Sequence, residues 1–318
     1  MIHGLSYTHT WIGEIIVSFR PLFLIGHIIV FSGLCIRTRW CLKKKHHQTP
    51  FSPDTMIIVW LIFLVPTCAN IYFVHTDYAG QFWEDTRTNH PSGIPILYAN
   101  ILKTNRNYEE IKTLIMQTNP TIIFFAERQA HHTANVPLLD QYPYTGRYRS
   151  ENVIFSKIPF TSLPSLVEPY SGRFYPRITI TLGEQRWRID FVHTTSPTSP
   201  RNFRQRNHQL TFLVSNIQED PNPYLILGDF NVTPHSSYYK QTLGGASGLT
   251  NVSMTDYTPR TRTFGNSSVL PAAHIDHVFV SNADAITNFR IINLKGSDHH
   301  AFFFHLTPSS PITSSSRQ

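Results

Sequence analysis

An uncharged run of 20 residues, 55–74 (TMIIVWLIFLVPTCANIYFV), constrains the fold of this chain more than any other feature. As a helix it would be about 30 Å long, which matches the hydrocarbon thickness of a bilayer. Pro66 would kink such a helix, and membrane helices tolerate a kink of this kind. The alternative is a core helix, but core helices are seldom so long and so uniformly apolar. The run therefore predicts a membrane-spanning helix.

A second apolar stretch precedes it. Residues 21–36 carry no charge, and a helix over 11–36 could span a bilayer if Arg20 reaches an interface. A buried core helix is again the alternative. We expect residues 1–74 to form a membrane anchor, a transmembrane hairpin with helices at 11–36 and 55–74.

A basic segment at 37–47 (RTRWCLKKKHH) separates the two stretches and predicts the orientation. It holds five Lys/Arg residues and no acid, and short loops of that kind stay in the cytoplasm. The large domain would then lie at the cell membrane on the non-cytoplasmic side, even if only the second helix spans. A signal peptide over 43–69 is a weaker interpretation, because about 40 residues precede its basic region.

The net charge of +7 suggests a nucleic-acid partner until it is placed along the chain. Residues 1–74 hold six Lys/Arg and two acidic residues, whereas the remaining chain holds 21 basic and 18 acidic residues. Most of the excess charge therefore belongs to the anchor. All three cysteines also lie there, so the large domain has no thiolate for a zinc site.

The rest of the chain divides into a polar linker (75–93), a large domain (94–306) and a tail of disordered composition (307–318). Helices are expected at 107–117 and 201–218. Buried strands are expected at 94–100, 121–127, 151–156, 177–182, 187–193, 223–230, 274–281, 286–294 and 299–306. Many strands with few helices indicate an α+β or α/β fold built on stacked sheets.

Polar residues recur where these strands begin or end. A carboxylate at such a position is rigidly held and partly desolvated, which suits metal binding or proton transfer. Each one alone is as well explained as a turn cap or a surface residue. Together they point to a site: Asn100, Glu127, His193, Asp229, Asn231, Asp276, Asp298 and His299.

Three motifs, GDFN (228–231), IDH (275–277) and SDHH (297–300), occur in the order and context of the endonuclease/exonuclease/phosphatase superfamily. The segment NPTIIFFAE (119–127) and the pattern H-x-x-S-P (193–197) resemble it as well. The resemblance covers about 95–306. It implies a four-layer sandwich, two central β-sheets flanked by helices, and phosphoester hydrolysis with Mg²⁺ or Mn²⁺.

The resemblance also implies roles for the polar residues. Glu127 would be the main metal ligand, helped by Asn100 and Asp298. Asp229 and Asn231 would position and deprotonate the attacking water. His299, held by Asp276, would contact the scissile phosphate, and His193 would donate a proton or contact the leaving group. Oxygen ligands fit Mg²⁺ chemistry, and an Asp behind a His favours the protonated ring.

The sequence leaves the phosphoester open. A tethered domain slightly favours a lipid-linked phosphate, and the alternative is a nuclease that acts on extracytoplasmic DNA or RNA. An inactive binding module is a remote third reading, because the constellation is intact. A nuclease needs a basic stripe, to which Arg173, Arg186, Arg188, Arg204 and Arg206 could belong. Arg177 and Arg201 are the candidates for contacting the substrate phosphate. No protein partner can be inferred from the sequence.

Overall fold

Strand β1 (Ile94–Asn100) shows why the apolar runs are almost uninterrupted. Ile96 and Tyr98 face one apolar cluster, whereas Leu97 and Ala99 face another on the opposite side of the sheet. The structure, a computed structural model, describes residues 10–18, 20–43, 93–148, 151–217, 222–244, 248–254 and 273–308, together with seven positions between 58 and 68.

The described strands form two six-stranded sheets. The first, in spatial order, contains β11 (Ile286–Asn293), β12 (His300–Leu306), β1, β2 (Ile122–Ala126), β4 (Val153–Ser156) and β3 (Tyr144–Arg147). The second contains β5 (Thr161–Val167), β6 (Phe174–Leu182), β7 (Gln185–His193), β8 (Tyr224–Asp229), β10 (Asp276–Val280) and β9 (Thr250–Asn251). Each sheet is antiparallel apart from one central parallel pair, β1–β2 in the first and β7–β8 in the second.

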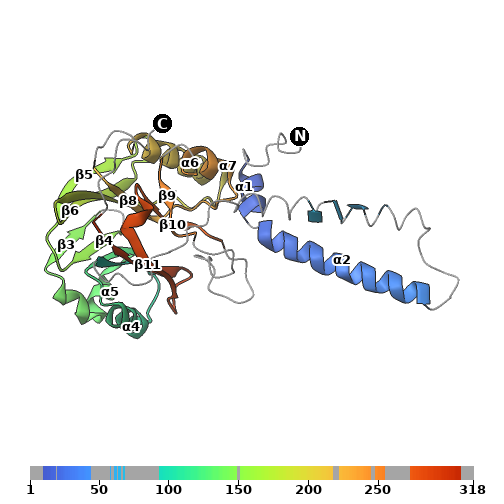
Figure 1. The fold of residues 1–318 in the computed structure, drawn as a ribbon, viewed down its shortest axis with the longest axis horizontal. Coiled ribbons are helices and arrows are strands. Elements are labelled where there is room, and N and C mark those ends of the chain that lie inside the picture. The colour runs from blue at the N-terminus through green and yellow to red at the C-terminus, as the bar shows by residue number, and fades with distance from the viewer. Residues whose placement is uncertain are drawn as a thin grey trace.

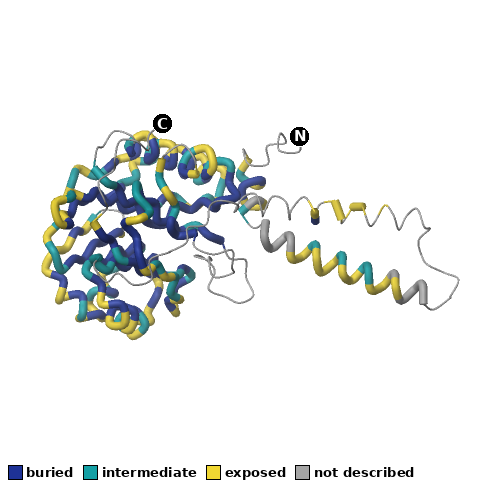
Figure 2. Tube along the Cα trace, in the orientation of Figure 1, coloured by how far each residue is buried: buried dark blue, intermediate teal, exposed yellow. Residues whose placement is uncertain are grey.

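Three apolar clusters hold the layers together. The largest lies between the sheets, where Phe124 of β2 packs edge-on against Phe191 of β7. Helix α4 (Tyr108–Thr118) covers the outer face of the first sheet through Ile111 and Leu114. Helix α6 (Pro200–Ser215) covers that of the second, beside α7 (Ser237–Thr242). The described part of the domain also contains three short helices: α5 (Ala130–Asn135), η3 (Pro137–Gln141) and η5 (Ala283–Ala285). The predicted arrangement of two sheets flanked by helices is confirmed (Figure 1), and the buried residues concentrate inside this domain (Figure 2).

The N-terminal region differs from the prediction. The single helix expected over 11–36 is two helices, α1 (Trp11–Ser18) and α2 (Arg20–Lys43). Helix α1 packs on the large domain, and α2 extends away from it (Figure 1). Residues 37–43, with the basic Arg37, Arg39 and Lys43, continue helix α2, so the loop expected over 37–47 begins no earlier than residue 44. Nothing in the local sequence ends the helix at 37, since Arg, Trp, Leu and Lys all favour or tolerate helix.

Most of the helix expected at 55–74 lies outside the described residues, although the seven described positions between 58 and 68 are helical. Within the part of the chain that the structure describes, no helix has both the length and the apolar character needed to cross a bilayer. Residues 75–92 of the linker and 309–318 of the tail also lie outside the description.

Candidate active site

One end of the sandwich collects the polar residues that flank the strands. The parallel pairs β1–β2 and β7–β8 both end there, and their antiparallel neighbours β12 and β10 begin there. Register places Asn100 beside Ala126 in one sheet, and His193 beside Asp229 in the other. Six of the predicted site residues therefore meet: Asn100, Glu127, His193, Asp229, Asp276 and His299.

Asn100 lies at the centre of this group and links the two sheets. Its amide Nδ2 is 3.3 Å from Glu127 Oε1, 3.4 Å from Asp229 Oδ2 and 3.4 Å from His299 Nε2. His193 closes the group from β7, with Nε2 3.9 Å from Glu127 Oε1 and 3.7 Å from Asp229 Oδ2. The site is therefore one compact constellation shared by both sheets.

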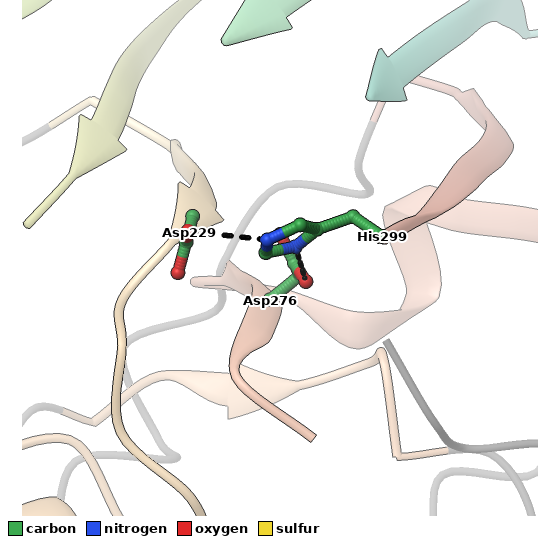
Figure 3. Close-up of side chains that lie close together, drawn as sticks. All are labelled: Asp229, Asp276 and His299. Atoms are coloured by element: carbon green, nitrogen blue, oxygen red, sulfur yellow. Dashed lines mark hydrogen bonds and ion pairs between the residues drawn. The ribbon is translucent and has the colours of Figure 1, made fainter. Parts of the chain in front are cut away.

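His299 is held between two carboxylates, as Figure 3 shows. Its Nδ1 is 2.8 Å from Asp276 Oδ2, and its Nε2 is 3.8 Å from Asp229 Oδ2. The hydroxyl of Tyr98 donates to the other oxygen of Asp276, at 2.6 Å. Burial alone would lower the pKa of His299, but the charges of Asp276 and Asp229 outweigh it and raise that pKa to about 10. The ring is therefore a cation at neutral pH.

The pKa of the Asp229 carboxyl lies near neutrality. Burial and the neighbouring charge of Asp276 raise its pKa to about 7, against the opposing effect of His299 and of the Asn231 backbone N–H. That N–H donates to Asp229 Oδ1 at 2.9 Å, and Asn231 itself adopts φ 50°. Asparagine tolerates this left-handed conformation better than most residues. A carboxylate whose pKa lies near neutrality is suited to accept a proton from water.

His193 contributes a neutral ring. Burial, together with the positive charges of Arg173 and His299, lowers its pKa to about 3. Arg173 also fixes the end of β7, because its Nε donates to the backbone oxygen of His193 at 2.8 Å. Two histidines in one site are thus set to opposite protonation states by their surroundings.

The donor set fits a hard divalent cation. Glu127 follows β2, remains partly exposed and offers carboxylate oxygens. The Asn100 amide presents its Nδ2 to Glu127 Oε1, while its Oδ1 accepts from the Leu102 backbone N–H, so it could ligate a cation only with the amide turned over. Asp298 Oδ1 is buried without a hydrogen-bond partner in the described part of the chain. Asp229, Asp276 and His299 also converge, with ligand atoms within 4.8 Å of one another. Oxygen ligands for a divalent cation are thus available both at Glu127 and Asp298 and at the pair Asp229 and Asp276.

Two predicted residues do not join the group. Arg177 on β6 forms an ion pair with Asp190 at 3.4 Å, and Arg201 lies exposed in the first turn of α6. Asn231 joins through its bond to Asp229, and Asp298 through its charge, which raises the pKa of His299.

Two functional neighbours were missed from the sequence. Tyr98 was assigned only to the core, yet it orients Asp276, and its position two residues before Asn100 on the same strand face was the available signal. Ser297 accepts from the His299 backbone N–H and donates to the Asn100 backbone oxygen at 2.7 Å. Its place in the SDHH motif could have indicated it.

Comparisons with known proteins agree with this geometry. The family model of the Endonuclease/Exonuclease/phosphatase family matches residues 97–299, more than half of the chain. The structure of TDP2 from D. rerio complexed with single strand DNA product is 16% identical, with a TM-score of 0.56, and the match covers 68% of this chain and 100% of that one. Truncated TDP2 from Caenorhabditis elegans is 14% identical, with a TM-score of 0.55 and coverage of 68% and 97%.

A further solved structure, the 3′ phosphatase NExo from Neisseria bound to product DNA hairpin, is 15% identical with a TM-score of 0.50, covering 68% of this chain and 100% of that one. At these identities the likeness concerns the fold. The comparison with curated protein sequences gave no match.

Proposed function

The chain belongs to the endonuclease/exonuclease/phosphatase family of metal-dependent phosphoester hydrolases, and from that premise we propose that it hydrolyses a lipid-linked phosphoester at a membrane. The observation that carries the hydrolytic part is the position of His299, a cation between Asp276 and Asp229 at the end of both sheets. A fixed positive charge next to a carboxylate of near-neutral pKa matches the needs of phosphoester hydrolysis.

Each side chain then has a task. Glu127 and Asn100, with Asp298, would hold a Mg²⁺ or Mn²⁺ ion, which would neutralise phosphate charge. Asp229 accepts the proton of the attacking water, while the Asn231 backbone keeps that carboxylate oriented. His299 donates a hydrogen bond to a phosphate oxygen and stabilises the charge that develops on it. The neutral His193 contacts the leaving-group oxygen.

The N-terminal helices support the membrane part of the proposal. Helix α2 exposes large aliphatic side chains, such as Ile25, Ile29 and Ile36, which a helix in water would normally turn inward. Helix α1, directly before it, contacts the loops that follow β7 and β8, through Pro197 and Ser236. Helix α2 therefore leaves the domain next to the catalytic end. A lipid-linked substrate would reach the site from that side.

The basic segment 37–47 supports an orientation in which the catalytic domain lies on the non-cytoplasmic side of the cell membrane. A reporter fused after Gln318 would report it, because activity outside the cytoplasm is expected. Reporter activity inside the cytoplasm would overturn the orientation and leave the hydrolase proposal untouched.

A nuclease is the second candidate, because two similar structures contain DNA: that of TDP2 with its single strand DNA product and that of NExo with a DNA hairpin. Two of the arginines that could form a basic stripe are buried in ion pairs instead, Arg188 with Asp190 and Arg206 with Glu14. Fewer free positive charges for a phosphate backbone favour the lipid substrate.

The deciding experiment uses the full-length protein in detergent and in vesicles, with Mg²⁺ or Mn²⁺. Phospholipid phosphodiesters, polyprenyl pyrophosphate, single-stranded DNA and a simple chromogenic phosphodiester are compared under the same conditions. The proposal expects turnover of a lipid substrate that is lost in Glu127→Gln and His299→Ala. Turnover of DNA alone would replace the lipid proposal with the nuclease. Absence of all turnover would refute hydrolysis and favour an inactive binding module.

A further inference from the structure

Helix α1 carries a buried acidic residue, Glu14, that contacts the catalytic domain. Glu14 is 2% exposed, although it lies in the otherwise apolar segment WIGEIIVS. Its Oε1 pairs with Arg206 Nη2 at 2.8 Å, 192 residues away on α6, and its Oε2 accepts from Ser236 Oγ at 3.0 Å. Arg206 is fully buried, so the two charges form an ion pair shielded from solvent.

Arg206 connects this ion pair to the loop that follows β8, which contains Asn231. Its Nη1 donates to the backbone oxygen of Asn231 at 2.8 Å, and its Nε donates to Asn207 Oδ1 at 2.8 Å. Asn231 is the residue whose N–H holds the carboxylate of Asp229. Three consecutive contacts therefore run from Glu14 through Arg206 and Asn231 to Asp229.

Two more bonds fix α1 over the same loops. Trp11 Nε1 donates to the backbone oxygen of Pro197 at 2.6 Å, in the loop that follows His193. Thr233, in the loop that follows β8, donates through Oγ1 to Ser18 Oγ at 3.4 Å. The first and last residues of α1 thus each contact a loop that carries site residues.

We propose that Glu14 is a positioning residue for hydrolysis: by neutralising and orienting Arg206, it holds the Asn231 backbone and with it the carboxylate of Asp229. Helix α1 is then a working part of the catalytic domain. The inference rests on the proposed function, since it concerns the carboxylate to which that function assigns the proton.

The physical reason is the cost of a buried, uncompensated charge. Without the Glu14 carboxylate, Arg206 would turn towards solvent or draw water into the contact, because a buried guanidinium needs a counter-charge. Its bond to the Asn231 oxygen would then loosen. A small displacement of a catalytic group from a remote change can reduce turnover by about a hundredfold.

The test measures kcat and KM of the full-length protein for the chromogenic phosphodiester, with Glu14→Gln as the principal variant. We expect kcat to fall about ten- to a hundredfold with KM within about twofold, because the binding groups stay in place. Glu14→Asp, which retains the charge, should recover part of the loss. Glu109→Gln makes the same change on an exposed acid of α4 and should leave both constants unchanged.

A comparison at equal stability separates positioning from general destabilisation. Leu114→Ala removes core contacts of α4, remote from the loops after β7 and β8. The kcat of each variant is measured at the same number of degrees below its own Tm. If Leu114→Ala loses as much kcat as Glu14→Gln, or if Glu14→Gln keeps wild-type kcat, the inference is wrong. If Glu14→Gln does not fold, Ser236→Ala, which removes one bond to Glu14, must lower kcat for the inference to stand. An inactive wild type would instead refute the proposed function.

Discussion

Replacing Asp276 by Asn isolates the electrostatic role of the His299–Asp276 pair. The variant keeps the size of the side chain and an oxygen that can accept from His299 Nδ1, but it removes the charge that most raises the pKa of that ring. Because burial acts in the opposite direction, the pKa of His299 should fall to its ordinary value of about 6.5 or below.

The size of the effect follows from the fraction of protonated ring. With a pKa of about 10, wild-type His299 is almost fully protonated at pH 8, whereas a ring with a pKa of about 6.5 is only about 3% protonated. Asp276→Asn should therefore lose about 30-fold in kcat/KM at pH 8 from protonation alone. At about pH 6 most of the rings are protonated in both proteins, so the kcat/KM of the variant should approach that of the wild type at the same pH.

The assay is a pH profile of kcat/KM from about pH 5.5 to 9 with the chromogenic phosphodiester and saturating Mn²⁺. Tyr98→Phe removes one hydrogen bond to Asp276 but no charge, so its profile should keep the wild-type shape. Asp140→Asn changes an exposed acid of η3 and serves as the matched control. A ratio of Asp276→Asn to wild type that stays constant across the whole pH range would refute the assignment of His299 as a cation held by Asp276.

Three further predictions concern metal binding and stability. Mn²⁺ should raise the Tm of the wild type in a thermal-shift assay and have no effect on Glu127→Gln; an equal rise in both would remove Glu127 from the metal site. Gly228→Ala should lower the free energy of unfolding by about 4 kcal/mol or more, because φ is +145° and a Cβ there would lie 1.8 Å from the Val192 backbone oxygen; a wild-type denaturation midpoint would contradict this. Burial, then the charge of His131, lowers the pKa of His132 to about 4, so its contribution to stability is present above about pH 6.5 and is lost as the pH falls towards 4. His132→Gln should show a shallower fall of Tm over that window, and identical slopes would disprove the assignment.

The sandwich could be predicted from the sequence because its central strands carry two apolar faces each. Ile96 and Leu97 of β1 point to different clusters, so the strand is apolar at every position and recognisable without knowledge of its partners. The edge strand β5 (Thr161–Val167) was missed for the opposite reason. Its side chains are mostly exposed, and Pro164 interrupts the pattern, as is usual only at an edge.

The candidate site was predictable to the same degree. Asn100, Asp229 and His299 each adjoin an apolar strand, so the topology alone brings them together once the strands are paired. The environment of Arg177, by contrast, could not be predicted from the sequence. Its type suggested a phosphate contact, but its nearest acid, Asp190, belongs to the adjacent strand, and such a pairing depends on register that composition does not contain.

The contact of Glu14 with the catalytic domain could not be predicted from the strand pattern. In the sequence it is a single acid near an apolar stretch, and a membrane interface accounts for it as well as a protein contact does. Among the described acids, it alone forms an ion pair with Arg206, which holds the loop behind Asp229. In that loop the Asn231 backbone carbonyl accepts from Arg206 of α6, and the buried charge of Arg206 requires a counter-ion. The sandwich supplies the arginine and helix α1 supplies the acid, so under the proposed role of Glu14 a helix outside the sandwich supports the carboxylate of Asp229.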